Sequence, residues 1–407
     1  MKPELLIPVG SPEALPIALA FGADAVYLGS DALSLRAKAE NFSDRRLREA
    51  LRYTHERGKK LYLAVNIFAR EADLAQAEQL FETLAAWEEK PDAFIVSDFG
   101  IIRLARRILP EVPLHISTQT NSTNSETIRF WQEQGASRVV CARELSLAEI
   151  SAIREKLPPE MELEAFVHGS LCMAYSGRCL ISSFLTGREA NRGLCTQPCR
   201  WQYAISEEKR PGLYMPLEET ERGTYLFNAK DLCMIEYLPR LIQAGICSLK
   251  VEGRMKNELY IATIARAYRL TMDALAESPA AYEALLPWLK EEVLKCTTRD
   301  YCTGFYFGPP APEDYNYQSS AYRQDYRYLG LVEEDAGGLF IRQKNKFLAG
   351  ESIEAIRPGG ENIPLTVDYF ESEEGERRES CPHPEEKLYI HTGVRLQAFD
   401  ILRKENL

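Results

Sequence analysis

Cysteines are the strongest candidates for chemistry. Four of them lie in residues 172–199, namely Cys172, Cys179, Cys195 and Cys199, and Cys233 follows farther along the chain. Cysteine thiolates are soft ligands that suit an iron–sulfur cluster or zinc. A zinc site favours pairs separated by about two to four residues, and here only the gap between Cys195 and Cys199 is that short. The spacing therefore indicates a metal site, with the metal and the four ligands among five cysteines left open.

The other cysteines are isolated and are interpreted as small buried apolar residues: Cys141, Cys247, Cys296, Cys302 and Cys381. No segment approaches the roughly 18 apolar residues that span a membrane, and the N-terminal residues lack the features of a signal peptide. We therefore expect a cytoplasmic protein. In that reducing compartment disulfides are rare, so clustered cysteines indicate a metal or catalytic role.

Two further residues are candidates for catalysis. Glu164 and His168 lie on one predicted strand, residues 162–168, and strict alternation would place them on the same face as Phe166. A Glu and a His on one face could form an acid–base or ligand-orienting pair. A buried structural ion pair is an equally good interpretation of these residues.

The elements that must position these residues follow a regular pattern in the first two-thirds of the chain. Phrases such as AFGADAVYLG and QAGICSLKVEG combine a helix end, a Gly and a buried strand. Eight strands with intervening helices predict a (β/α)8 TIM-like barrel, with an open doubly wound sheet as the alternative. The predicted strands cover residues 4–8, 25–29, 60–66, 93–97, 113–117, 137–141, 162–168 and 246–252.

We predict three regions along the chain. Residues 1–300 form the α/β barrel, and a long insertion between its seventh and eighth strands (residues 169–245, the cysteine insertion) carries the cysteine group. A long connection at the carboxyl end of a barrel strand is typical of a functional site. Residues 301–321, rich in Gly, Pro and Tyr, form a linker, and residues 322–407 form a small all-β barrel domain.

Longer motifs carry a family resemblance. The segment EAFVHGSLCMAYSGRCLISS is similar to the signature of the collagenase-like peptidase family U32, and HISTQTNSTN, CARELSL, NRGLCTQPCR and LKVEGRMKNELY agree with it. The resemblance covers essentially the whole chain, including the β domain. Much of this family resembles RNA and ubiquinone hydroxylation proteins, and members with such a β domain resemble those that hydroxylate tRNA.

The resemblance implies a cofactor, a reaction and partners. Family members are understood to hold a 4Fe-4S cluster on four cysteines, which would be Cys172, Cys179, Cys195 and Cys233 here, with Cys199 as the competitor for the third place. The implied enzyme forms 5-hydroxyuridine at the wobble position of tRNA without molecular oxygen, with prephenate as the hydroxyl donor. The implied partners are the tRNA anticodon region, prephenate, and a further copy or a paralogous subunit, with no membrane.

Polar residues that follow the predicted strands are the substrate-binding candidates. Amides could hydrogen-bond a uracil edge or a ligand carboxylate, and Arg suits bidentate binding of the dicarboxylate. The residues on and after the eighth strand should share one face. The candidates are Gln119, Asn121, Arg143, Arg178, Lys250, Glu252 and Arg254, and Arg36 is a further dicarboxylate candidate.

The charge of the chain limits how it could bind RNA. A net charge of −11 disfavours a general nucleic-acid binder but allows a local basic patch. Residues 103–110 fit a solvated helix face better than an RNA patch, whereas residues 322–330 and 342–347 mix cations with aromatic residues in a way that suits unpaired bases.

Two other functions remain alternatives: a peptidase, and a non-catalytic cluster-bearing partner subunit. The sequence has no HExxH motif and no G-x-S-x-G motif. A Cys–His nucleophile pair such as Cys172 with His168 could be proposed, but their four-residue separation sets no triad geometry.

Overall fold

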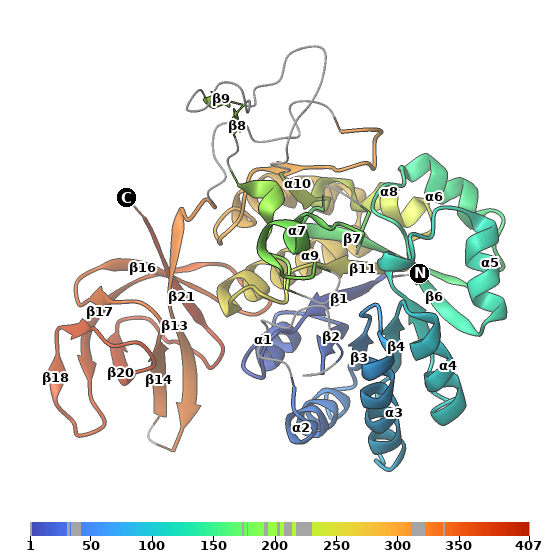
Figure 1. Cartoon of the computed structure of the whole chain (residues 1–407). Coiled ribbons are helices and arrows are strands. Elements are labelled where there is room, and N and C mark those ends of the chain that lie inside the picture. Colours follow the sequence, from blue (N-terminus) through green and yellow to red (C-terminus); the bar gives the residue numbers. More distant parts are fainter. Residues whose placement is uncertain are drawn as a thin grey trace.

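The computed structural model describes residues 2–406 except 31–32, 34–41, 173–174, 177, 191–193, 202–203, 207–213, 217–229, 311–321 and 337. An α/β barrel is followed by a small antiparallel β barrel, and the two lie side by side (Figure 1). The predicted fold class is confirmed.

Eight parallel strands form the first barrel. Neighbours along the chain pair with one another, and the last strand pairs with both the seventh and the first, which closes the ring and excludes an open sheet. The strands are β1 (Glu4–Pro8), β2 (Ala25–Gly29), β3 (Lys60–Val65), β4 (Ala93–Val96), β5 (Leu114–Ile116), β6 (Ala136–Val140), β7 (Glu162–Ser170) and β11 (Ser248–Val251).

Helices surround this barrel and start from side-chain caps that the sequence supplies. Asp98 accepts hydrogen bonds from the backbone N–H groups of Gly100 and Ile101, and Ser146 forms a capping box with Glu149. The helices that follow the eight strands are α1 (Ala14–Ala20), α2 (Asp44–His55), α3 (Glu71–Ala85), α4 (Phe99–Ile108), α5 (Ser125–Glu133), α6 (Leu147–Arg154), α8 (Leu238–Gln243) and α9 (Glu258–Glu277), with α10 (Pro279–Glu292) after them.

The cysteine insertion adds structure at the carboxyl end of β7. Its described parts include α7 (Ile181–Thr186), the 3-10 helices Pro198–Arg200 and Ile235–Tyr237, the hairpin β8 (Ala204–Ser206) and β9 (Tyr214–Pro216), and β10 (Asp231–Cys233). β10 pairs antiparallel with β7. A short strand, β12 (Tyr301–Cys302), pairs in turn with β10, so the first residues of the expected linker belong to the barrel sheet.

The second domain is a closed barrel of six antiparallel strands. Their order is β16, β21, β13, β14, β20 and β17, and β17 also pairs with β16. Apolar side chains of these strands fill its interior. The strands are β13 (Tyr326–Asp335), β14 (Gly338–Gln343), β16 (Ser352–Ile356), β17 (Ile363–Glu371), β20 (Lys387–Thr392) and β21 (Ile401–Glu405), with short β15 (Phe347–Leu348), β18 (Arg377–Arg378) and β19 (Ser380–Cys381).

A buried ion network fixes the second domain to the first. Glu292 of α10 accepts hydrogen bonds from Arg266 of α9 and, at 2.6 Å, from Arg403 of β21. All three side chains are fully buried. Arg266 also donates to Asn362 Oδ1 at 2.7 Å. Glu292 thus joins a buried guanidinium group of the first domain to one of the second, which holds the two domains in one orientation.

Candidate functional site

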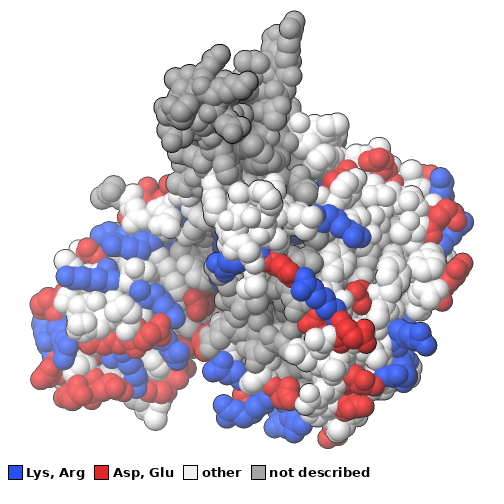
Figure 2. Space-filling view, in the orientation of Figure 1, with Lys and Arg blue, Asp and Glu red and all other residues white. Residues whose placement is uncertain are grey.

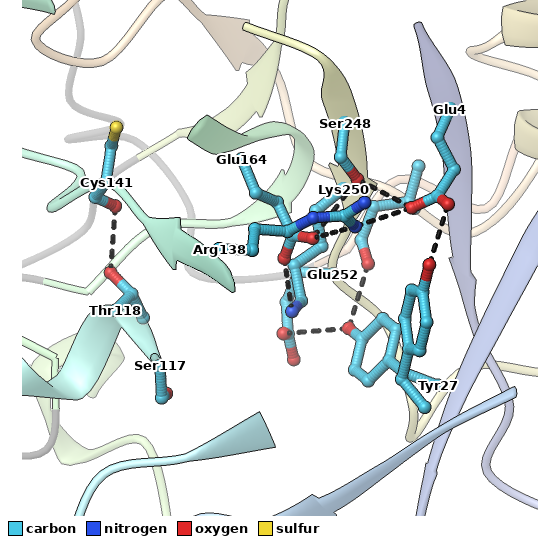
Figure 3. A network of polar contacts seen from close by, with 12 residues as sticks. Glu4, Tyr27, Ser117, Thr118, Arg138, Cys141, Glu164, Ser248, Lys250 and Glu252 are labelled. Atoms are coloured by element: carbon cyan, nitrogen blue, oxygen red, sulfur yellow. Dashed lines mark hydrogen bonds and ion pairs between the residues drawn. The ribbon is translucent and has the colours of Figure 1, made fainter. Parts of the chain in front are cut away.

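The interior of the α/β barrel holds a buried ion network (Figure 3). Lys250 Nζ of β11 donates to Glu164 Oε1 of β7 at 2.7 Å. Arg138 of β6 donates to Glu164 Oε2 at 3.1 Å and to Glu4 Oε1 at 2.6 Å, and Ser248 Oγ donates to both carboxylates at 3.1 Å. Glu164 is 1% exposed and Arg138 is 3% exposed. The network therefore joins β1, β6, β7 and β11 across the barrel.

These contacts set the charge of Glu164. Burial on its own raises the pKa of this carboxyl, but the charges and hydrogen bonds of Lys250 and Arg138 outweigh it and hold the pKa below its usual value. Burial lowers the pKa of Lys250, and the Glu164 carboxylate opposes that shift. Glu164 is thus an ionised carboxylate clamped by two cations, which is the arrangement expected of a structural ion pair.

A β-bulge turns His168 out of the barrel interior. Lys250 of β11 lies opposite Phe166, and the next residue of β11 lies opposite His168, so β7 carries one extra residue at this point. The imidazole Nδ1 lies 3.4 Å from Tyr268 Oη on α9, and Nε2 lies 3.2 Å from Tyr301 Oη on β12. His168 therefore packs between the barrel wall and its outer layer.

The prediction that Glu164 and His168 share one face is wrong, because the bulge breaks the alternation on which it rested. Burial, with a smaller contribution from the charge of Lys256, lowers the pKa of His168 to about 3. Both ring nitrogens contact tyrosine hydroxyls. The suggested Cys172–His168 pair also lacks support, because those hydroxyls occupy the positions that a nucleophile would need.

The residues on and after β11 gather around one aromatic ring at the barrel mouth, the end where the carboxyl termini of the strands lie. Lys250 Nζ lies 4.6 Å from the centre of the Tyr27 ring, and the Arg254 guanidinium lies 5.8 Å from it. Tyr27 Oη donates to the Val251 carbonyl at 2.9 Å and to Glu252 Oε2 at 3.4 Å. The expectation that Lys250, Glu252 and Arg254 lie together agrees with this geometry.

Arg143, which follows β6, completes this group. Its guanidinium lies 3.9 Å from the centre of the Phe166 ring and donates to the Ser170 carbonyl at 2.6 Å. It also lies 3.9 Å from a Glu252 carboxylate oxygen. Three cations therefore stand beside two aromatic rings, with one carboxylate between them. We call Tyr27, Arg143, Phe166, Lys250, Glu252 and Arg254 the mouth cluster.

A glycine allows the strand ends of the mouth cluster to approach each other. Gly169 has φ +105°, and a Cβ at this position would lie 2.4 Å from the Glu252 carbonyl oxygen. Any other residue would push β7 and β11 apart where they carry Phe166 and Lys250.

The remaining substrate-binding candidates form a second group at the end of β5. Gln119 is buried, with its amide oxygen 3.4 Å from Ser117 Oγ. Asn121 adopts a left-handed backbone and accepts a hydrogen bond from Arg178 Nε at 3.1 Å. The Arg178 guanidinium also lies 5.0 Å from the centre of the Phe68 ring. Arg36 lies outside the described residues.

The predicted metal ligands lie in the cysteine insertion or at its end. Cys172 comes two residues after β7, and Cys233 ends β10, whose backbone pairs with His168 of β7. Cys172 and Cys195 are exposed, and Cys179 and Cys233 are partly buried. Within the described part of the chain, no three Cys, His, Asp or Glu side chains converge closely enough to hold a metal. The thiols suit an iron–sulfur cluster chemically, but the described geometry does not assemble the four-cysteine set.

Sequence reasoning missed several polar residues of the barrel interior, and Tyr27, Tyr62 and Arg138 are examples. Tyr62 Oη donates to Glu4 Oε2 at 2.7 Å and so belongs to the ion network. Each stands in a mostly apolar strand, in AVYLG, KLYLAV and ASRVV. A polar side chain inside such a strand was the available signal, because a buried polar group requires a partner.

Each of the basic segments considered for RNA contains cations that are paired with carboxylates. Arg107 pairs with Glu78, and Arg342 Nη2 lies 2.8 Å from Glu333 Oε2. Arg323 Nη2 lies 2.7 Å from Asp325 Oδ2. These contacts agree with the interpretation of residues 103–110 as a solvated helix face and weaken the case for residues 322–330 and 342–347.

Comparison with known proteins gives two family matches. The family model described as Peptidase family U32 matches residues 10–316. A second, described as Peptidase family U32 C-terminal domain, matches residues 324–403. No helix among the described residues is long and apolar enough to cross a membrane.

Three curated relatives match nearly the whole chain. The tRNA hydroxylation protein P1 of Bacillus subtilis is 36% identical over 406 residues, which cover 99% of this chain and 95% of that protein. The tRNA hydroxylation protein P of Escherichia coli is 37% identical, covering 94% and 92%. A protein named Collagenase from Porphyromonas gingivalis is 34% identical, covering 95% and 97%.

Proposed function

We propose that this chain, which belongs to peptidase family U32, is an RNA-modifying enzyme that hydroxylates tRNA. The observation that carries the proposal is the match to tRNA hydroxylation proteins across both domains. A shared catalytic barrel alone would leave the substrate open, whereas here the C-terminal domain is shared as well. The proposed place of action is the cytoplasm.

The proposed reaction forms 5-hydroxyuridine at the wobble position of tRNA without molecular oxygen. Replacing the C5–H bond by C5–OH oxidises the base by two electrons. One oxygen atom moves to C5, and the donor that gives it up takes the electron pair. Prephenate is the proposed donor, and it would be reduced by two electrons in this exchange.

The mouth cluster supplies groups that suit both substrates. Prephenate is a dicarboxylate, and the guanidinium groups of Arg143 and Arg254 can bind carboxylates in bidentate fashion. Lys250 adds a third positive charge beside them. The rings of Tyr27 and Phe166 offer apolar faces against which a flipped-out base could stack. In this proposal Glu164 positions Lys250 and does not itself transfer a proton.

We retain a 4Fe-4S cluster on Cys172, Cys179, Cys195 and Cys233 as part of the proposal. The donor set supports it, since four thiolates match the ligation of such clusters. No step above passes through the cluster. Its test is anaerobic purification, which should give about four irons and four sulfides per chain; a colourless protein with stoichiometric zinc would exclude it.

A peptidase is the second candidate, because one full-length relative is named Collagenase. Against it, His168 is buried between two tyrosine hydroxyls and is not placed to act as the base for the Cys172 thiol. A non-catalytic partner subunit is the third.

The deciding experiment measures nucleosides of tRNA by mass spectrometry in a strain that lacks this gene. We expect 5-hydroxyuridine and its derivatives to disappear and to return with the wild-type gene. Unchanged nucleosides, in a strain that also lacks any paralogue, would refute hydroxylation. Activity of the purified chain alone would separate an enzyme from a partner subunit, and hydrolysis of gelatin would favour the peptidase.

A further inference from the structure

Helix α2 and the turn after it form a basic surface on an acidic protein. Residues 43–60 contain seven Lys or Arg and three Asp or Glu, in a chain whose net charge is −11. Figure 2 shows Lys and Arg gathered over α2, at the lower middle of the view. Three exposed arginines, Arg45, Arg48 and Arg52, follow one another on the outer face of the helix and span about 10 Å along its axis. We call them the α2 ridge.

The ridge keeps most of its charge available to a ligand. Arg45 is 82% exposed, and its one described ion pair is a long contact of 3.9 Å to Glu49. The guanidinium of Arg48 lies over the Trp87 ring at 4.7 Å, which orders the side chain without neutralising it. Arg52 has no ion pair among the described residues. Glu49 and Glu56 line the same surface pocket as the three arginines, so this surface is basic but also carries negative charge.

Three basic residues of the β domain contrast with this ridge. In the β domain, Arg342, Lys344 and Lys387 each contact at least one carboxylate within 2.8 Å. A cation already paired at that distance has less to gain from a phosphate. The α2 ridge therefore differs from these three cations by its unpaired charge.

The position of the ridge connects it to the mouth cluster. Ser30, at the end of β2, bridges to Phe42, just before α2. The first turn of α2 with Arg45 therefore lies at the barrel mouth, and Arg48 and Arg52 lead away from it along the outside of the barrel. Tyr27 of the mouth cluster belongs to the same β2.

We propose that the α2 ridge binds the phosphate backbone of the RNA substrate and guides it to the barrel mouth. The inference rests on the proposed function, because it takes RNA to be the substrate. Phosphates of any nucleic acid carry the charge that these arginines complement. The ridge would contribute affinity and leave the choice of base to the mouth cluster.

The test compares tRNA binding by three forms of the full-length protein. The ridge variant R45Q/R48Q/R52Q is matched by R103Q/R107Q/R377Q, which removes three exposed arginines from α4 and β18. The third form, R45K/R48K/R52K, keeps the charge. Binding of unmodified tRNA is measured by fluorescence anisotropy at several salt concentrations. Each lost phosphate contact should reduce the slope of log K against log salt by about 0.7 to 0.9.

We expect the ridge variant to lose roughly two units of slope and more than tenfold in affinity at low salt, with the control and the lysine variant close to wild type. An equal slope for the ridge variant and wild type, an equal loss in the control, or no tRNA binding by wild type would each overturn the inference. The nucleoside assay keeps the two proposals apart. If wild type hydroxylates tRNA but the ridge variant keeps the wild-type slope, only the inference about the ridge is refuted. If the ridge variant loses slope but wild type does not hydroxylate tRNA, only the proposed reaction is refuted.

Discussion

Replacing Glu164 by Gln tests whether this residue is structural or catalytic. The substitution keeps the shape of the side chain and removes its charge. Lys250, which lies 2.7 Å away and is 4% exposed, then loses its nearest carboxylate. Arg138 loses one of its contacts but keeps Glu4 and Glu162. The substitution therefore leaves mainly the buried charge of Lys250 uncompensated.

The expected loss of unfolding free energy is about 3 kcal/mol, because removing one partner of a buried ion pair leaves the other charge uncompensated. Urea denaturation followed by circular dichroism measures it. The matched control is E162Q, whose carboxylate contacts the same Arg138 at 2.7 Å but is 45% exposed. Solvent screens that pair, so its loss should cost under about 1 kcal/mol.

The pH dependence supplies a second readout. The pKa of Glu164 is lowered in the folded state, so its contribution to stability is complete above the unfolded pKa of about 4.3 and is lost as the pH falls through the folded value. E164Q should lack this part of the acid dependence. If E164Q instead matches E162Q in stability and abolishes hydroxylation, the structural assignment is refuted and Glu164 is catalytic.

Three further predictions concern the third cysteine ligand, the protonation of His168 and the ion network at Glu292. Iron content after anaerobic purification should fall in C195S and stay near wild type in C199S; the reverse result would exchange the third ligand. Because the pKa of His168 is lowered to about 3, NMR should show a neutral imidazole at pH 5. The free energy of unfolding should decline as the pH falls below about 6.5, the pKa of His in the unfolded state. An imidazole titration with a midpoint near pH 6.5 would contradict the burial of His168. E292Q removes a carboxylate from two buried arginines and should lower the free energy of unfolding by about 3 to 5 kcal/mol. The control E354Q changes a carboxylate that is 23% exposed and should lower it by under about 1 kcal/mol. Equal losses in the two variants would show that the network does not hold the domains together.

The barrel could be predicted from sequence because its strands carry local signals. The expected strand 25–29 matches β2 to the residue, and 4–8 matches β1. The strand β2 follows a phrase that recurs along the chain, in which a glycine ends a helix and an apolar run follows, and β1 is itself a short apolar run. The β domain could be predicted from its short strands and turns. The strand β12 could not, since its two residues form a strand only by pairing with β10 from a distant segment.

The site residues could be predicted from the sequence less well than the fold, also because of contacts between distant segments. Alternation along β11 placed Lys250 and Glu252 correctly because no bulge interrupts the strand between them and the mouth. On β7 the same rule failed at His168, because the bulge arises from register against β11 and has no signature in β7 itself. Partners such as Arg138 come from strands far away in sequence, so pairwise contacts of this kind cannot be read from a local pattern.

The separation of roles inside the barrel follows from where the charges lie along the strands. Glu4 and Ser248 begin β1 and β11, and with Arg138 and Glu164 they satisfy one another deep in the barrel. Among the residues that the structure describes, Lys250 belongs to both this network and the mouth cluster, where it lies over the Tyr27 ring. A ligand carboxylate at the mouth would share this ammonium group with Glu164. If the proposed dianionic donor binds at the mouth, its binding and the stability of the barrel interior are coupled through Lys250. K250M should then weaken donor binding, even where E164Q/K250M restores stability by removing both buried charges.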